Sequence, residues 1–134
     1  MKKMTIEFFM AMLPPTHTHQ EKQVHVVNGK PKFYEPDELK ATRLKLRDHL
    51  GRFIPEHPYT GAVRLVTKWC YPTEGKHKAG EYKTTKPDTD NMIKMLKDEM
   101  TKAHFWKDDA QVASEITEKF WSNVPGIYVR IEEV

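Results

Sequence analysis

Alternating apolar and polar positions indicate that much of this chain forms β-strands. Along residues 62–71, large or β-branched side chains occupy every second position, with Arg64 and Lys68 between them. A period of two is typical of a strand that buries one face in the core. The residues expected on that buried face are Val63, Leu65, Thr67, Trp69 and Tyr71. Three further stretches are predicted as strands: residues 4–13, 111–120 and 126–132.

A short hairpin is predicted at residues 24–34. Its centre, Asn28-Gly29, supplies the positive φ angles that a two-residue turn needs. Pro31 has no N–H group to donate to a neighbouring strand, so we expect this hairpin at the edge of a sheet.

Two helices are expected. Residues 35–51 carry Pro36 near the first position, acidic side chains in the first turn, and Gly51 where the helix stops. A second helix over residues 91–103 has an apolar face formed by Met92, Leu96, Met100 and Ala103. The segment 72–87 before it is rich in lysine and has almost nothing to bury, which predicts a mobile loop or a loose hairpin.

The order of elements is strand, hairpin, helix, strand, loop, helix, strand, strand. A chain of 134 residues is long enough for one hydrophobic core and too short for two domains of ordinary size. We therefore predict a single α+β domain over residues 1–134, with a mixed β-sheet flanked by two helices.

Composition narrows the class of protein. The chain is 38% hydrophobic and 31% charged, which is typical of a globular protein with a heavily charged surface. Its formal charge of +3 is too small to argue for nucleic acid by itself. The single cysteine, Cys70, excludes an intrachain disulfide, and no apolar stretch reaches membrane-spanning length. Glu7 interrupts the apolar N-terminal run, so a signal peptide is not expected and the predicted location is the cytoplasm.

Carboxylates gather around the second predicted helix. Asp88 and Asp90 are two residues apart, so in extended backbone both side chains project to one side, near the positive end of a helix that begins at Asn91. The helix and the turn after it can bring Asp109, which follows Asp108, back beside Asp90. Three adjacent carboxylates repel one another unless a cation lies among them. Ligands that are all oxygen suit Mg²⁺, or Mn²⁺ in its place.

Simpler interpretations of these residues remain open. Asp90 alone can serve as a helix cap. An EF-hand is rejected, because Met92 and Ile93 stand where that loop needs an oxygen ligand and a glycine. Lys94 lies four residues after Asp90 and can reach the carboxylates. It can stabilise negative charge on a phosphate there, or it can belong to an ordinary ladder of surface ion pairs.

Basic side chains precede the carboxylates. These lysines are predicted to contact the DNA backbone: Lys76, Lys78, Lys83 and Lys86. A second basic stripe, Lys40, Arg43 and Arg47, is as compatible with a solvated helix face as with DNA. The histidines and Cys70 match no standard zinc spacing, so a structural zinc is not expected.

The block from Lys86 to Val112 carries a recognisable pattern. It reads D-x-D-N-x-x-K, a further aspartate four residues after the lysine, and then F-W-x-D-D-A-Q-V. In this arrangement it resembles the RusA-type Holliday junction resolvases, which are small phage and bacterial endonucleases. Pro87 departs from the pattern, because many relatives have an arginine there; Lys86 is its expected substitute.

The resemblance implies a homodimeric, Mg²⁺-dependent endonuclease that resolves four-way DNA junctions by paired nicks, in DNA recombination, repair or phage DNA processing. The implied catalytic residues are Asp88, Asp90, Asp109 and Lys94, of which the three aspartates hold the metal. The implied supporting residues are Asn91, Asp98, Asp108 and Gln111. The expected partners are branched DNA and a second copy of the chain, and no membrane.

Two other functions remain as alternatives. One is a non-catalytic nucleic-acid-binding protein whose aspartates are caps and ion-pair partners. The other is a general divalent-metal nuclease without preference for junctions. A binding protein has no reason to gather three carboxylates beside DNA, where they repel the phosphates.

Overall fold

The fold is described from a computed structural model of the chain. It describes residues 3–16, 23–27, 30–34 and 37–134, with the backbone alone for the second and third of these ranges. In chain order the elements are β1 (Thr5–Met10), β2 (Gln23–Val27), β3 (Lys30–Tyr34), α1 (Asp37–Leu50), β4 (Val63–Pro72), α2 (Thr89–Lys102), the 3₁₀ turn η1 (Asp109–Gln111), β5 (Val112–Ser122) and β6 (Gly126–Glu133).

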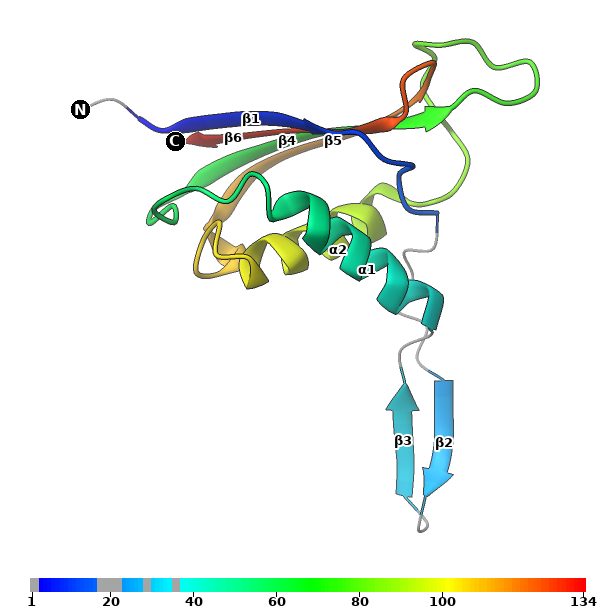
Figure 1. The fold of residues 1–134 in the computed structure, drawn as a ribbon, viewed down its shortest axis with the longest axis horizontal. Helices are drawn as coiled ribbons and strands as arrows, with labels where there is room; N and C mark the ends of the chain where they lie inside the picture. Colours follow the sequence, from blue (N-terminus) through cyan, green and yellow to red (C-terminus); the bar gives the residue numbers. More distant parts are fainter. Residues whose placement is uncertain (1–2, 17–22, 28–29, 35–36) are drawn as a thin grey trace.

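A four-stranded mixed sheet forms the centre of the domain. Its strand order is β1-β6-β4-β5, in which β4 and β5 are parallel and the other neighbours are antiparallel. The parallel pair requires a long crossover, and α2 lies within it. In Figure 1, α1 and α2 lie side by side against one face of the sheet. The predicted α+β class and mixed sheet are confirmed.

The core lies between the sheet and the two helices. The alternation in β4 predicted its inward face correctly, since Val63, Leu65 and Trp69 are fully buried. The apolar face of α2 is also as predicted, with Met92 and Met100 fully buried beneath the sheet. Both helices therefore owe their position to apolar stripes that the sheet covers.

The helix α2 begins earlier than the sequence pattern indicated. Its first helical residue is Thr89, and Asp88 is the N-cap with φ −74° and ψ 142°. The backbone N–H of Met92 donates to the carbonyl of Asp88 at 3.1 Å, which adds two residues before Asn91 to the helix. Asp90 therefore lies in the first helical turn and not in extended backbone.

The segment between β4 and α2 is held against β5 by its backbone. The N–H of Gly80 donates to the carbonyl of Trp121 at 2.8 Å, and the N–H of Lys83 donates to the carbonyl of Lys119 at 2.9 Å. The ring of Tyr82 stacks on that of Phe120, with centroids 4.8 Å apart. Of the two expectations for residues 72–87, a mobile loop or a loose hairpin, the mobile loop does not describe residues 80–83, because the free edge of β5 gives their backbone hydrogen-bond partners.

The predicted hairpin is present as β2 and β3, which pair only with each other in a two-stranded sheet. In Figure 1 this hairpin lies beyond the N-terminal end of α1, apart from the main sheet. The turn residues Asn28 and Gly29 lie outside the described residues. In the described part of the chain, no helix has the length and apolar character needed to cross a membrane.

Candidate functional site

Asp88 presents a free carboxylate at the N-terminal end of α2. It occupies the N-cap position, yet its side chain makes no capping hydrogen bond. The side chain is exposed, and the N-terminus of a helix favours negative charge. A cap residue normally uses its oxygen to bind an N–H group of the first turn. The Asp88 carboxylate is therefore not used in capping and is available to a ligand.

The first two turns of α2 add a second carboxylate and a cation. Asp90 and Lys94 are both exposed, and Asn91 between them is half-buried. The spacing of four residues places Asp90 and Lys94 on one side of the helix. Within the described residues Lys94 forms no ion pair, so the surface ladder considered from the sequence does not engage it.

Lys119 of β5 is a further cation at this end of the helix, and it was not predicted. Its Nζ donates hydrogen bonds to the carbonyls of Thr85 and Pro87, at 2.6 and 2.7 Å. Burial lowers the pKa of Lys119, and the negative charge of Asp88 acts in the opposite direction. Both carbonyls belong to the chain just before Asp88, so this lysine fixes the entry into the helix.

The third predicted metal ligand lies at the other end of α2. The carboxylate of Asp109 accepts a hydrogen bond from the hydroxyl of Thr101, in the last turn of the helix. The indole Nε1 of Trp106 also donates to Asp109, at 3.4 Å, and to the Thr101 hydroxyl, at 2.8 Å. These contacts hold Asp109, which is half-buried, in one orientation.

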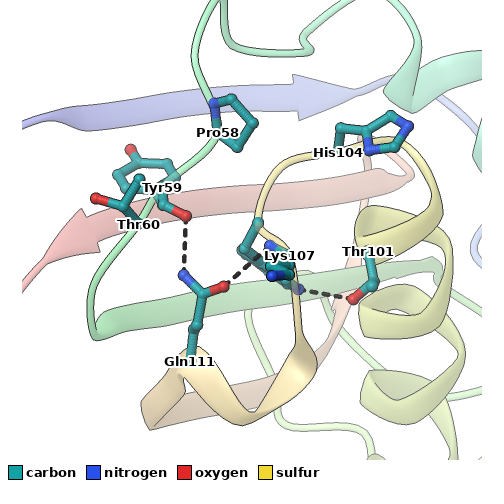
Figure 2. Close-up of a pocket in the computed structure, with 8 residues that line it drawn as sticks. Pro58, Tyr59, Thr60, Thr101, His104, Lys107 and Gln111 are labelled. Atoms are coloured by element: carbon teal, nitrogen blue, oxygen red, sulfur yellow. Dashed lines mark hydrogen bonds between the residues drawn. The ribbon is translucent and has the colours of Figure 1, made fainter.

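Asp108 and Gln111 shape the turn that carries Asp109. The Asp108 carboxylate accepts from the N–H of Ala110 at 2.9 Å, and Asp108 and Gln111 together form a capping box around η1. The Gln111 amide donates to the carbonyl of Tyr59 at 2.8 Å and accepts from the N–H of Lys107 at 2.9 Å (Figure 2). The predicted supporting role of these two residues is thus a structural one.

A pocket of about 570 Å³ opens beside this second end of α2. Figure 2 shows residues from three places around it: Tyr59 before β4, Thr101 at the end of α2, and Gln111 in η1. The Tyr59 ring is buried, and this burial raises the pKa of its phenol to about 12. Thr101 and Trp106 line the pocket and also bind Asp109, so the pocket adjoins Asp109 and not Asp88.

The three aspartates do not converge within one chain. An α-helix rises about 1.5 Å per residue, which separates Asp90 from Thr101, and so from the neighbourhood of Asp109, by about 17 Å along the axis. In the part of the chain that the structure describes, no three His, Cys, Asp or Glu side chains are grouped closely enough to hold a metal ion. The expectation that the chain folds Asp109 back beside Asp90 is wrong for a single copy.

Asp98 also lies apart from the other candidate residues. Its carboxylate is 3.6 Å from the guanidinium of Arg43, at the interface between the two helices. Beside it the fully buried Glu99 accepts from Arg47 Nε at 3.0 Å, and this contact raises the pKa of Arg47. Two members of the basic stripe on α1 thus pair with carboxylates of α2, which identifies them as packing residues.

The predicted DNA-binding lysines divide into two kinds. Lys76, Lys78 and Lys86 are exposed, as a contact with phosphate requires. Lys83 is only 8% exposed, with its Nζ 4.4 Å from the centre of the Trp121 ring. Burial and the nearby Lys119 lower the pKa of Lys83. Lys83 therefore does not belong to the exposed basic surface that the sequence predicted.

Comparison with known proteins assigns the family. The family model described as endodeoxyribonuclease RusA matches residues 13–132, which include both ends of α2 and all of β5. The chain belongs to the RusA endodeoxyribonuclease family. The resemblance seen in the block from Lys86 to Val112 thus extends over almost the whole domain, and the expected enzyme class is that of the family.

Two relatives match over most of their lengths. The crossover junction endodeoxyribonuclease rusA of Lactococcus phage r1t is 30% identical over 134 aligned residues, covering 98% of this chain and 99% of the phage protein. The Bacillus subtilis (strain 168) protein YqaN is 32% identical over 118 residues, covering 80% of this chain and 82% of YqaN. Both matches have the extent of a single shared domain.

Proposed function

We propose that this RusA-family protein is a divalent-metal-dependent endonuclease that resolves four-way DNA junctions by paired, symmetric nicks. The observation that carries the proposal is the Asp88 carboxylate at the start of α2, which is exposed and unused in capping, with Asp90 and Lys94 in the first two turns of the helix. The family of the chain and its phage relative support the same activity.

The residues at this end of α2 fit a hard divalent cation. Mg²⁺ is usually held by one or two carboxylates and keeps several waters or substrate phosphate oxygens as its other ligands. Asp88 and Asp90 supply that number of carboxylates, and their oxygen donors accept Mn²⁺ as well. When bound, the metal supplies an activated water and neutralises charge on the scissile phosphate.

Asp109 takes part through a second copy of the chain in this proposal. Because one copy separates Asp109 from Asp90 by about 17 Å along the helix, we assign the third carboxylate to the partner in a homodimer. A two-fold dimer that brings Asp109 of one protomer to Asp88 of the other forms two such sites at once. Two equivalent sites match the two strands that are cut in a four-way junction.

Lys94 acts as an electrostatic stabiliser. Its exposed ammonium lies on the same side of α2 as Asp90 and stabilises negative charge that develops on the phosphate. The exposed lysines of the preceding segment, Lys76, Lys78 and Lys86, hold the DNA backbone.

The test compares substrates and metals at equal ionic strength. A synthetic four-way junction and a linear duplex of the same sequence are incubated with the protein in Mg²⁺, in Mn²⁺ and in EDTA. Symmetric nicks in the junction alone, abolished by EDTA, are expected. Equal cleavage of both DNAs points to a nuclease without junction selectivity, and binding without cleavage in either metal refutes the proposed activity.

A further inference from the structure

We propose that Lys119 is a positioning residue of this active site: its ammonium fixes the backbone from which Asp88 reaches the metal. This inference rests on the proposed function, because it assigns Lys119 a part in that same metal site. It adds a residue of β5 to a site otherwise built from α2 and from the turn before β5.

The position of Lys119 follows from the register of the sheet. Lys119 lies opposite Trp69 of β4, and in a parallel pair such residues share a face of the sheet. Trp69 is fully buried on the face that the helices cover. The Lys119 side chain therefore projects toward α2 and the chain before it, while Phe120 projects to the other face.

The hydrogen bonds of Lys119 hold one short stretch of backbone. Its Nζ bonds the carbonyls of Thr85 and Pro87, and its own carbonyl accepts from the N–H of Lys83. The bond to Pro87 acts on the peptide group that joins directly to Asp88. Hydrogen bonds from an ammonium to carbonyls are charge-assisted and stronger than neutral ones. They therefore restrict this peptide group more than the peptide groups of an ordinary surface loop are restricted.

A purely electrostatic role and a positioning role for Lys119 predict opposite changes in metal affinity when the residue is replaced. The ammonium is close enough to Asp88 for that carboxylate to influence its pKa. If the ammonium acted only through its charge, its removal would relieve repulsion and tighten the binding of a divalent cation. If it positions Asp88, its removal weakens metal binding, and loss of such an orienting interaction typically costs 10-fold to 100-fold in affinity.

The variant Lys119→Met removes the charge and both hydrogen bonds with little change in volume. We expect its affinity for Mn²⁺, titrated alone and followed by electron paramagnetic resonance, to fall by about tenfold. The Mg²⁺ concentration for half-maximal junction cleavage should rise by the same factor, with metal-free junction binding unchanged. Lys119→Arg keeps the charge and the donors and should bind Mn²⁺ more tightly than Lys119→Met does.

The matched control is Lys97→Met. Lys97 also joins α2 to β5, by a 2.8 Å bond to Glu115, but it has no contact with the chain before Asp88. Its Mn²⁺ affinity should equal that of the wild type. If near-ultraviolet circular dichroism shows that Lys119→Met does not fold, Lys119→Gln replaces it. The glutamine amide is too short to reach both carbonyls, so the same loss of Mn²⁺ affinity is expected.

The outcomes separate the two proposals. If Asp88→Asn abolishes the Mn²⁺ binding of the wild type but Lys119→Met and Lys119→Gln bind Mn²⁺ as tightly as the wild type or more tightly, the role of Lys119 alone is overturned. No Mn²⁺ binding by the wild type, or binding that Asp88→Asn leaves intact, overturns the proposed metal site itself.

Discussion

The hydroxyl of Thr101 donates a hydrogen bond to the carboxylate of Asp109, and so fixes Asp109 to the last turn of α2. Asp88 occupies the N-cap position at the opposite end of the same helix, with its carboxylate unused in capping. A single rigid element therefore carries the proposed metal ligands at its two ends, about 20 Å apart for a helix of this length. In a two-fold dimer, the start of one α2 can meet the end of the other.

The Thr101 contact leads to a first prediction. Thr101→Val removes the hydroxyl that orients Asp109, and it should lower metal-dependent junction cleavage about tenfold while it reduces the free energy of unfolding by about 1 kcal/mol. Thr42→Val is the control, because the Thr42 hydroxyl bonds a carbonyl within α1. Equal cleavage by the two variants would show that the orientation of Asp109 does not matter.

A second prediction concerns the exposed lysines before α2. The triple variant Lys76→Ala, Lys78→Ala and Lys86→Ala should weaken junction binding, measured in EDTA to prevent cleavage. The dependence of log affinity on log salt should become shallower by about 0.9 for each phosphate that is no longer neutralised. Neutralising three exposed cations elsewhere, Lys40, Lys45 and Arg52, is the charge-matched control. An unchanged salt dependence in the first triple variant removes these lysines from the DNA interface.

The buried Glu99 should matter for stability. Its carboxylate lies among Arg43, Arg47 and Lys102, at 3.0 to 3.6 Å. Glu99→Gln leaves these cations without their buried counter-charge, and we expect a loss of about 3 kcal/mol in urea unfolding. The exposed pair partner Glu115 gives the comparison, since Glu115→Gln should cost less than about 1 kcal/mol. Similar losses in the free energy of unfolding from both variants would mean that the burial of Glu99 does not strengthen its contribution to stability.

Lys83 gives a prediction on pH. Burial lowers its pKa from 10.5, so between the lowered value and 10.5 the folded state binds fewer protons than the unfolded state. Stability conferred by this residue therefore rises with pH across that interval. Urea unfolding at pH 7.5 and at pH 10 should show the wild type gaining stability relative to Lys83→Met. Lys76→Met, which removes an exposed lysine, should show no such gain; a flat difference for Lys83→Met contradicts the burial argument.

Some of this site was predictable from the sequence. The apolar stripe of α2 and the alternation in β4 have clear periods, which is why these elements and their buried faces were predicted correctly. The sequence also placed Asp88 and Asp90 at a helix start. The distance from that start to Thr101 follows from the helical rise, but the hydrogen bond that holds Asp109 beside Thr101 is a contact that no local pattern predicts.

Other features depended on tertiary contacts. Lys119 faces the chain before Asp88 because β5 pairs with β4 in one register, and a shift by one residue would turn it to the other face. Asp98 forms an ion pair with Arg43 because α1 packs on α2. Lys83 is buried because its chain segment adds to the edge of β5. No local sequence pattern around Lys119, Asp98 or Lys83 predicts these contacts.

The most direct test of the account is subunit complementation. Asp88→Asn and Asp109→Asn chains, each inactive alone, are co-expressed with different tags, and mixed dimers are assayed on a four-way junction. In a site shared between protomers, a mixed dimer keeps one intact site and concentrates both changes in the other. Purified mixed dimers should then have about half of the wild-type number of sites, seen as single nicks in Mg²⁺. Complete absence of nicking by purified mixed dimers would contradict a metal site that joins Asp88 of one protomer to Asp109 of its partner.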